Sequence, residues 1–204
     1  MNEETELETR SFTLNDVECR SEDGKMNVKG YAIRFGEPSV LLGGSFKEII
    51  DNRSLDNVDM SNVYLLNNHN TGDILGSTKG GTMNLTVTDR GLHFSADLPD
   101  TNLGRDTFEL VKRGDLSNCS FGFTVDKDTW DVTQSPEVRT VTSIGQLKEL
   151  TLTAFPAYET SSVSVRSLDT LNKCQDCRSE MNSQTAIQDE NRELAKSIYE
   201  SIKQ

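Results

Sequence analysis

The sequence predicts a mostly β domain with a few helices, an α+β fold. Short runs of alternating apolar and polar residues recur from residue 25 onward, as in half-buried strands. Only residues 103–113 carry convincing helical spacing, and just 34% of the 204 residues are hydrophobic. We therefore expect a disordered N-terminus over 1–9, one domain over 10–166, and a polar tail over 167–204 that ends in an amphipathic helix.

The first half of this domain is predicted to contain strands and one short helix. MNVKGYAIRFG alternates like a strand that ends in a turn at Gly36. Ser45 and Glu48 in SFKEII have the spacing of a capping box, which predicts a short helix. NVYLLNNHN reads as a strand that runs into polar residues around His69. TMNLTVTD and GLHFSADLP, joined around Asp89, have the spacing of a β-hairpin.

The second half begins with the predicted helix. Asp100 or Thr101 can cap its start, and Gly114 can end it. CSFGFTVD then resembles a buried strand, and RTVTSIGQLKELTLTAF holds one or two more strands before Pro156. The apolar face of the helix is predicted to contain Leu103, Thr107, Leu110 and Val111.

The charge balance excludes several classes of partner. With 21 basic and 33 acidic residues the net charge is -12, which disfavours binding to nucleic acid or to an anionic membrane. No apolar run approaches the roughly 18 residues of a membrane-spanning helix. The acidic start MNEETELETR does not resemble a secretory signal. We expect a protein without nucleic-acid or membrane partners.

The four cysteines are predicted to be free thiols, because nothing indicates secretion. Cys174 and Cys177 form one CxxC, whereas a structural zinc site usually needs two further ligands at matching spacing. We expect neither a metal nor a cofactor. A small zinc-binding module built on this CxxC remains an alternative, which a metal assay would test.

Three residues can carry chemistry. His69 follows an apolar strand, where an imidazole suits proton transfer, although a plain surface-loop histidine has the same pattern. Ser120 opens the apolar strand NCSFGF, where it is either a nucleophile or a small strand residue; Ser117 is a weaker rival in the turn before it. His93 alternates with apolar neighbours and is predicted to face solvent.

Glu149 is the acidic candidate. By alternation it shares a strand face with Leu147, Thr151 and Thr153, while Leu150 and Leu152 share the other face. A partly buried carboxylate there needs a partner. That partner is either an imidazole N–H or a cross-strand Lys or Arg, and the sequence leaves both open.

Five segments, in this order, resemble the prohead (maturation) protease family of tailed bacteriophages. They are GYAIRFG; NNHN followed by DILGST; DRGLHFSADLPDT; DTFELVKRGDLSNCSFGF; and LKELTLTAFPAYETS. The match runs from about Val28 to Ser162. Cys119 stands where Met is common in this family and Thr151 where Ser is common, and both changes are mild.

The resemblance implies a serine protease related in fold to the herpesvirus assemblin proteases, with a β-barrel and flanking helices. It maps the nucleophile to Ser120, the general base to His69 and the acid to Glu149. The herpesvirus relatives use a second histidine instead of an acid, a role that His93 is poorly placed to fill.

The resemblance also implies where the enzyme acts. It would cleave the scaffold-like N-terminal arm of the major capsid protein, and itself, inside the immature phage capsid in the bacterial host cytoplasm. Self-association is an open expectation. The alternative is a non-catalytic capsid assembly or scaffolding protein that keeps the protease fold.

Overall fold

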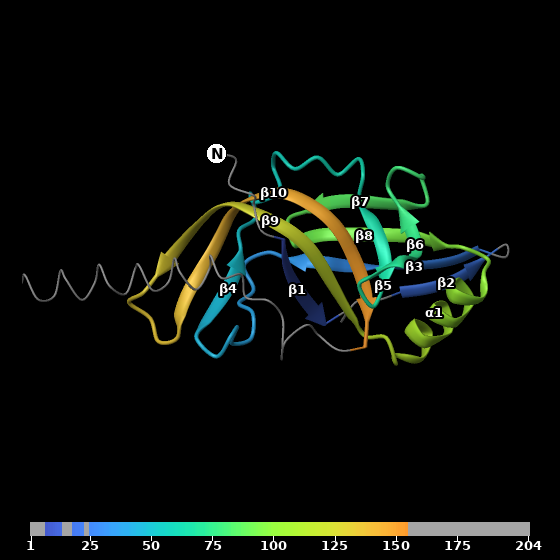
Figure 1. Cartoon of the computed structure of the whole chain (residues 1–204), viewed down its shortest axis with the longest axis horizontal. Helices are drawn as coiled ribbons and strands as arrows, with labels where there is room; N and C mark the ends of the chain where they lie inside the picture. The colour runs from blue at the N-terminus through green and yellow to red at the C-terminus, as the bar shows by residue number, and fades with distance from the viewer. Residues whose placement is uncertain (1–6, 14–17, 23–24, 155–204) are drawn as a thin grey trace, which may run out of the picture. The chain divides into compact units, whose positions relative to one another are not determined.

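The computed structural model describes residues 7–13, 18–22 and 25–154. This part of the chain forms ten strands and one helix (Figure 1). In chain order they are β1 (Glu8–Thr13), β2 (Glu18–Glu22), β3 (Lys25–Arg34), β4 (Phe46–Ile50), β5 (Tyr64–Asn67), β6 (Asn70–Ser77), β7 (Met83–Thr88), β8 (Gly91–Leu98), α1 (Asn102–Arg113), β9 (Asn118–Asp131) and β10 (Glu137–Thr153).

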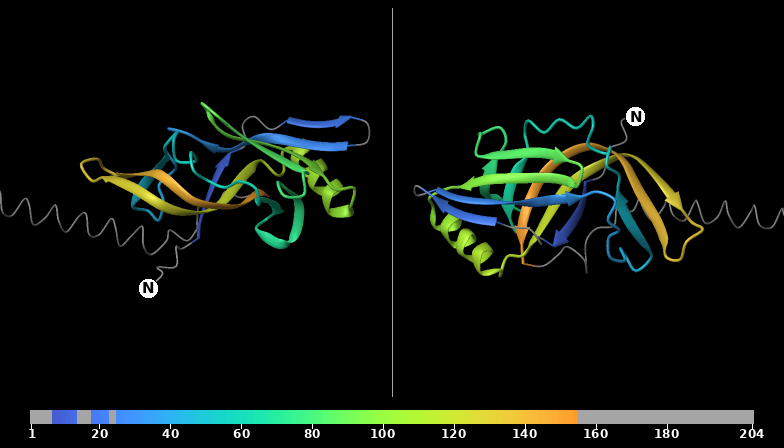
Figure 2. Two further views of the ribbon diagram at one scale, coloured as in Figure 1. Left: turned by 90° about the horizontal axis from the view of Figure 1, so that it is seen from above. Right: turned by 180° about the vertical axis from the view of Figure 1, so that it is seen from behind.

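The strands form two sheets. One has the order β1-β9-β10-β5-β6, with β4 pairing with β10 as well, and the other has the order β2-β3-β8-β7. The long strands β9 and β10 run side by side through the views of Figures 1 and 2, while β4 lies along the first half of β10. The mostly β, α+β class is confirmed. The barrel is not, because neither sheet closes into a ring within the described residues.

The N-terminal boundary predicted at residue 10 is too late. β1 begins at Glu8 and pairs antiparallel with β9, so Glu8 and Thr9 belong to a sheet. The acidic composition that suggested disorder is misleading here, because the Glu8 carboxylate is buried against two arginines. The predicted polar tail over 167–204 lies outside the described residues.

The short helix predicted from Ser45 and Glu48 is wrong. These residues lead into and occupy β4, in which Phe46, Glu48 and Ile50 are buried in strict alternation. The pairing of β4 with β10 satisfies the backbone groups that a helix cap would otherwise serve. Here tertiary pairing overrides the local capping pattern.

The predicted helix and hairpin are confirmed. α1 begins after Thr101, whose side chain accepts a hydrogen bond from the Gly104 amide, and it ends at Gly114 in the left-handed conformation. Its buried face is turned from the predicted one, because Phe108 is buried whereas Leu110 is 38% exposed. β7 and β8 pair antiparallel across the predicted turn.

β9 and β10 divide their side chains between an apolar and a polar face. Phe121, Phe123, Leu150 and Leu152 belong to the hydrophobic core. Ser120, Gly122, Glu149 and Thr151 alternate with them and therefore project from the opposite face. The pairing of these two strands thus provides both a core and a row of polar groups.

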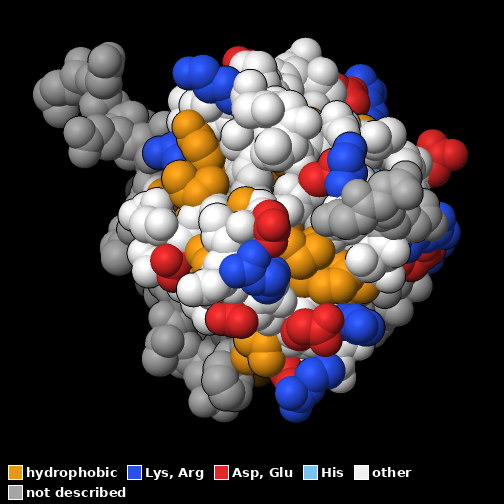
Figure 3. Space-filling view, turned by 90° about the vertical axis from the view of Figure 1, so that its right-hand side faces the viewer, with side chains coloured by type: hydrophobic (Ala, Val, Ile, Leu, Met, Phe, Trp, Pro, Cys, Tyr) orange, Lys and Arg blue, Asp and Glu red, His pale blue; other side chains and the backbone are white. Residues whose placement is uncertain are grey.

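Acidic, basic and apolar side chains mix on the surface shown in Figure 3. Among the described residues, the exposed large hydrophobic side chains come from separate parts of the sequence: Leu7, Val40, Leu41, Ile74, Val87 and Leu110. In the same part of the chain, no helix has the length and apolar character needed to cross a bilayer.

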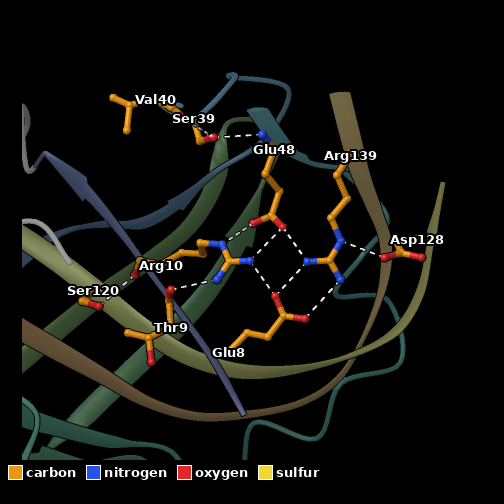
Figure 4. A network of polar contacts seen from close by, with 9 residues as sticks. All are labelled: Glu8, Thr9, Arg10, Ser39, Val40, Glu48, Ser120, Asp128 and Arg139. Atoms are coloured by element: carbon orange, nitrogen blue, oxygen red, sulfur yellow. Dashed lines mark hydrogen bonds and ion pairs between the residues drawn. The ribbon is translucent and has the colours of Figure 1, made fainter. Parts of the chain in front are cut away.

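Four buried charged side chains and the half-buried Asp128 form a cluster at the β1–β9–β10–β4 junction, which we call the charge network: Glu8, Arg10, Glu48, Asp128 and Arg139 (Figure 4). Arg10 donates to both oxygens of Glu48, at 2.7 and 3.0 Å. Arg139 donates to both oxygens of Glu8, at 2.7 and 3.1 Å, and also to Glu48 and Asp128. Such two-pronged guanidinium–carboxylate pairs fix geometry as well as charge.

The charges in this cluster sustain one another. Burial by itself raises the pKa of Glu8, but hydrogen bonds and attraction from Arg139 and Arg10 outweigh it, and the pKa falls below its ordinary value. Burial likewise disfavours the charged form of Arg139, but Glu8, Glu48 and Asp128 outweigh it and raise that pKa. The network therefore favours the ionised forms of Glu8 and Arg139.

Removing one member of the charge network should lower the stability of the folded protein. We expect Arg139→Met to lower the free energy of unfolding by about 3–5 kcal/mol, because the buried carboxylates of Glu8 and Glu48 must then share Arg10 as their single guanidinium partner. The matched control is Arg53→Ala, which breaks an exposed ion pair with Asp56 and should cost at most about 1 kcal/mol. Urea unfolding measures both. Equal losses in the two variants would contradict a dominant role for the charge network.

Acid should weaken the same network. Because the pKa of folded Glu8 lies below its ordinary value of 4.5, its contribution is complete above about that pH and is lost as the pH falls through the lowered pKa. Unfolding midpoints measured from pH 7 to pH 3 should therefore fall more steeply in the wild type than in Glu8→Gln. Parallel curves for the two proteins would exclude this linkage.

Candidate active site

The polar face of β9 and β10 brings the candidate residues into one neighbourhood. In the β9–β10 register Ser120 lies opposite Thr151, and Gly122 lies opposite Glu149. Directly opposed residues in antiparallel strands have Cβ atoms roughly 4.5–5.5 Å apart. Strand pairing alone thus places the predicted nucleophile and the predicted acid on the same face, two residue pairs apart along the strands.

His69 reaches this face from a tight turn between β5 and β6. Asn67 pairs with Asn70, so Asn68 and His69 are the two central residues of the hairpin, with φ angles of 49° and 57°. Two left-handed central residues define a type I′ turn, a conformation that asparagine and histidine tolerate better than most residues. β5 pairs with β10 in parallel from Tyr64 opposite Glu149 to Asn67 opposite Leu152, so the turn lies along β10 just past Leu152, within side-chain reach of Glu149.

The imidazole of His69 pairs with the carboxylate of Glu149. His69 Nδ1 lies 2.7 Å from Glu149 Oε1. An ionised carboxylate only accepts hydrogen bonds, so Nδ1 carries the proton and Nε2 of the neutral ring is left with a lone pair. The structure therefore brings two of the three predicted site residues into direct contact, with Nε2 available as a proton acceptor.

Gly122 makes room for this pair. A Cβ atom at position 122 would lie 2.9 Å from Cγ and 3.4 Å from Oε1 of Glu149. The first distance is shorter than real Cβ contacts, so a side chain here would displace the glutamate. The glycine of the SFGF motif therefore lets the Glu149 side chain lie across β9.

Ser120 has a different hydrogen-bond partner from the one predicted. Its side chain is fully buried, and its Oγ donates to the backbone carbonyl of Arg10 at 2.9 Å. Among the described residues, His69 Nε2 is buried and has no hydrogen-bond partner. The Ser120 hydroxyl and the His69 ring are thus not connected in this conformation.

Thr151 and Cys119 are neighbours of Ser120, and only Thr151 adds a polar group to the site. The buried Thr151 hydroxyl, opposite Ser120, has no partner within the described part of the chain. Strand alternation had placed it on the face of Glu149, but nothing in the sequence marked it as functional. Cys119 is not a rival nucleophile, because burial raises the pKa of its thiol to about 12 and keeps it protonated.

His93 lies elsewhere. It belongs to β8 in the second sheet, where its ring packs edge-on against Tyr31 with 5.3 Å between ring centroids. It is half-buried, not solvent-facing as predicted, and burial lowers its pKa. The structure gives it a packing partner and does not pair it with His69.

A cavity of about 800 Å³ adjoins the acid end of the site. Glu149 lines it together with apolar side chains from before β1 and from β5, β6 and β10, which are Leu7, Leu66, Ile74 and Leu147. Its volume lies within the range of ligand sites, roughly 300–1,000 Å³. Among the described residues, no group of three or more potential metal ligands gathers there or elsewhere; Cys174 and Cys177 lie outside those residues.

Comparisons with known proteins assign the chain to a family through its sequence. The sequence is 27% identical over 177 residues to the prohead protease of Enterobacteria phage HK97, covering 83% of this chain and 73% of that protein. The solved capsid assembly protease of bacteriophage T4 aligns with a TM-score of 0.42 and 9% identity, covering 74% of this chain and 96% of that one; the family assignment does not depend on it. The sequence model of the caudovirus prohead serine protease family matches residues 12–174. The chain therefore belongs to the caudovirus prohead serine protease family.

Proposed function

We propose that this protein is the serine endopeptidase that cleaves the scaffold-like N-terminal arm of the major capsid protein, and itself, inside the immature capsid. Its family is one of serine proteases of phage capsid maturation. The observation that carries the catalytic proposal is the 2.7 Å contact between His69 and Glu149 on the strand face that also bears Ser120.

In this proposal Ser120 Oγ attacks the carbonyl carbon of a peptide bond. A serine hydroxyl is a weak nucleophile until a base accepts its proton. His69 Nε2 accepts that proton and then delivers it to the leaving amine, which breaks the C–N bond. Water, activated by the same imidazole, hydrolyses the acyl-enzyme and releases Ser120.

Glu149 is the positioning acid. Its hydrogen bond to Nδ1 selects the tautomer in which Nε2 accepts a proton, and its charge stabilises the imidazolium that forms. The side chain of Glu149 is 16% exposed, so its interaction with His69 is only partly screened by water. The Thr151 hydroxyl, buried opposite Ser120, is a further polar group that can donate or accept a hydrogen bond once Ser120 turns toward His69.

The substrate would bind as an extended chain. The adjoining cavity offers apolar walls from Leu66 and Ile74 beside Glu149, which suits an apolar side chain next to the cleaved bond. Because this substrate is assembled inside the immature capsid, we place the protease there, within the host cell.

Loss of any member of the triad should abolish processing. Ser120→Ala, His69→Ala and Glu149→Gln should each lower the cleavage rate by roughly 10⁴-fold or more, because triad members act as a unit. The assay is mass spectrometry of this chain and of the major capsid protein of the same phage, produced together.

Ser117→Ala is the matched control. Ser117 lies three residues before Ser120, and its hydroxyl accepts a hydrogen bond from Asn118 at 3.3 Å instead of facing His69. It should leave cleavage intact. If all four variants process the capsid protein like the wild type, the chain is a non-catalytic assembly protein and this proposal is wrong.

Gly122→Ala should weaken catalysis without removing any triad group. The added methyl would push Glu149 away from His69, and a misplacement of about 1 Å costs on the order of 10²-fold in rate. Gly76→Ala is the control, since its Cβ would meet Thr82 Oγ1 at an ordinary 3.4 Å. Rates of peptide cleavage measured for both variants test this. Full activity in Gly122→Ala would show that the His69–Glu149 contact is not needed.

A further inference from the structure

We propose that the edge of β9 beside Ser120, which β1 now covers, is the docking surface for the extended peptide substrate. β1 is its resident occupant and has to leave before cleavage. This inference rests on the proposed function of Ser120 and His69 and concerns what controls access to them.

The first observation concerns a single proton. The Ser120 hydroxyl donates to the carbonyl of Arg10 in β1, while His69 Nε2 has no partner among the described residues. A hydroxyl has one proton to donate, so the same proton cannot be shared with Nε2 at the same time. The bond to β1 must break before His69 can act as a base on Ser120.

The strand order explains why the two interactions compete. β9 lies between β1 and β10. His69 approaches over β10, because it follows β5, which pairs with the far edge of β10. The Arg10 carbonyl lies on the opposite side of β9. The Ser120 hydroxyl is thus drawn toward β1 and away from the imidazole.

β1 lies where an added peptide strand would lie. One flank of β9 is paired with β10 along its whole length, so only the β1 flank is available to a further strand near Ser120. β1 pairs there antiparallel from Glu8 to Thr13, with Ser11 opposite Ser120. Extended peptides commonly bind proteins by adding a strand to a sheet edge in this way. Leu7, just before β1, lines the same cavity as Glu149.

The attachment of β1 is separable from the rest of the sheet. Two ion pairs hold it: Glu8 with Arg139 of β10, and Arg10 with Glu48 of β4. If β1 leaves, Arg139 keeps Glu48 at 2.8 Å and Asp128 at 2.7 Å, so the remaining charges still have partners. Because Glu8 and Arg10 carry opposite charges, the net charge of the cluster is unchanged. Both residues also precede position 12, where the match to the family model begins.

The test uses the full chain with Glu8→Gln/Arg10→Gln, which removes both ion pairs of β1 and leaves only its backbone pairing with β9. The matched control is Glu18→Gln/Arg20→Gln, which makes the same changes at the same spacing in β2, where the pair is exposed and 3.3 Å apart. Two rates are measured for each: modification of Ser120 by a fluorophosphonate, located by mass spectrometry, and cleavage of a peptide substrate.

We expect both rates to rise at least tenfold in Glu8→Gln/Arg10→Gln and to stay at the wild-type level in the control. A synthetic peptide with the sequence of residues 7–13, LETRSFT, should slow both reactions of Glu8→Gln/Arg10→Gln by taking the place of β1. The same peptide with proline at the Phe12 position should not, because the backbone amides of Glu8, Arg10 and Phe12 face β9, on the side of the Arg10 carbonyl, and proline lacks this donor.

Folding is checked by thermal unfolding of each variant. If Glu8→Gln/Arg10→Gln unfolds below the assay temperature, Phe12→Pro takes its place with the same expectations, because it removes a backbone amide that faces β9 and keeps every charge. If Ser120 is modified and the peptide is cleaved at equal rates in the wild type and in the variant that loosens β1, the inference is wrong and the proposed function stands. If Ser120 reacts in no variant, both the inference and the proposed function are wrong.

Discussion

The antiparallel pairing of β9 with β10 is the interaction on which the remaining structure depends. Its register places Ser120 against Thr151 and Gly122 against Glu149 on one face, while phenylalanine and leucine side chains fill the core on the other. A shift of one residue would exchange these faces and bury the glutamate in the core. The hydrophobic pattern that stabilises the fold therefore also fixes the position of the polar groups.

Other elements attach to this pair and supply what two strands cannot. The parallel pairing of β5 with β10 places the Asn68–His69 turn beside β10 near Leu152, from which the His69 side chain contacts Glu149. β4 pairs with the first half of β10 and provides Glu48, which joins two arginines in the charge network. A buried ionic cluster of this kind adds less to net stability than well-packed apolar residues would. Its effect is to fix which strand lies beside which.

The N-terminal strand connects the charge network to the candidate active site. Arg10 takes part in both, through its guanidinium at Glu48 and through its carbonyl at the Ser120 hydroxyl. A change in the state of β1 is therefore a change in the hydrogen bond of the nucleophile. For a protease that is packaged together with the proteins it is proposed to cut, such a connection would delay cleavage until assembly has advanced.

The sequence by itself determined the elements whose pattern is local. Alternation located the β7–β8 hairpin and the two faces of β10 from Glu149 to Thr153, and capping residues located both ends of α1. Alternation misplaced Leu147, because a β-bulge before Glu149 puts Leu147 opposite Phe123 in the core. The sequence also singled out His69, Ser120 and Glu149, since the segments that carry them resemble one protease family. Only the tertiary structure decided between an imidazole and a basic partner for Glu149, made residues 46–50 a strand, and placed residues 8–13 in a sheet. These outcomes depend on partners 38 to 131 residues away in sequence, such as Arg10 for Glu48 and Arg139 for Glu8. Local propensity carries no information about such distant partners, because the free energy of the contact appears only once the chain has folded.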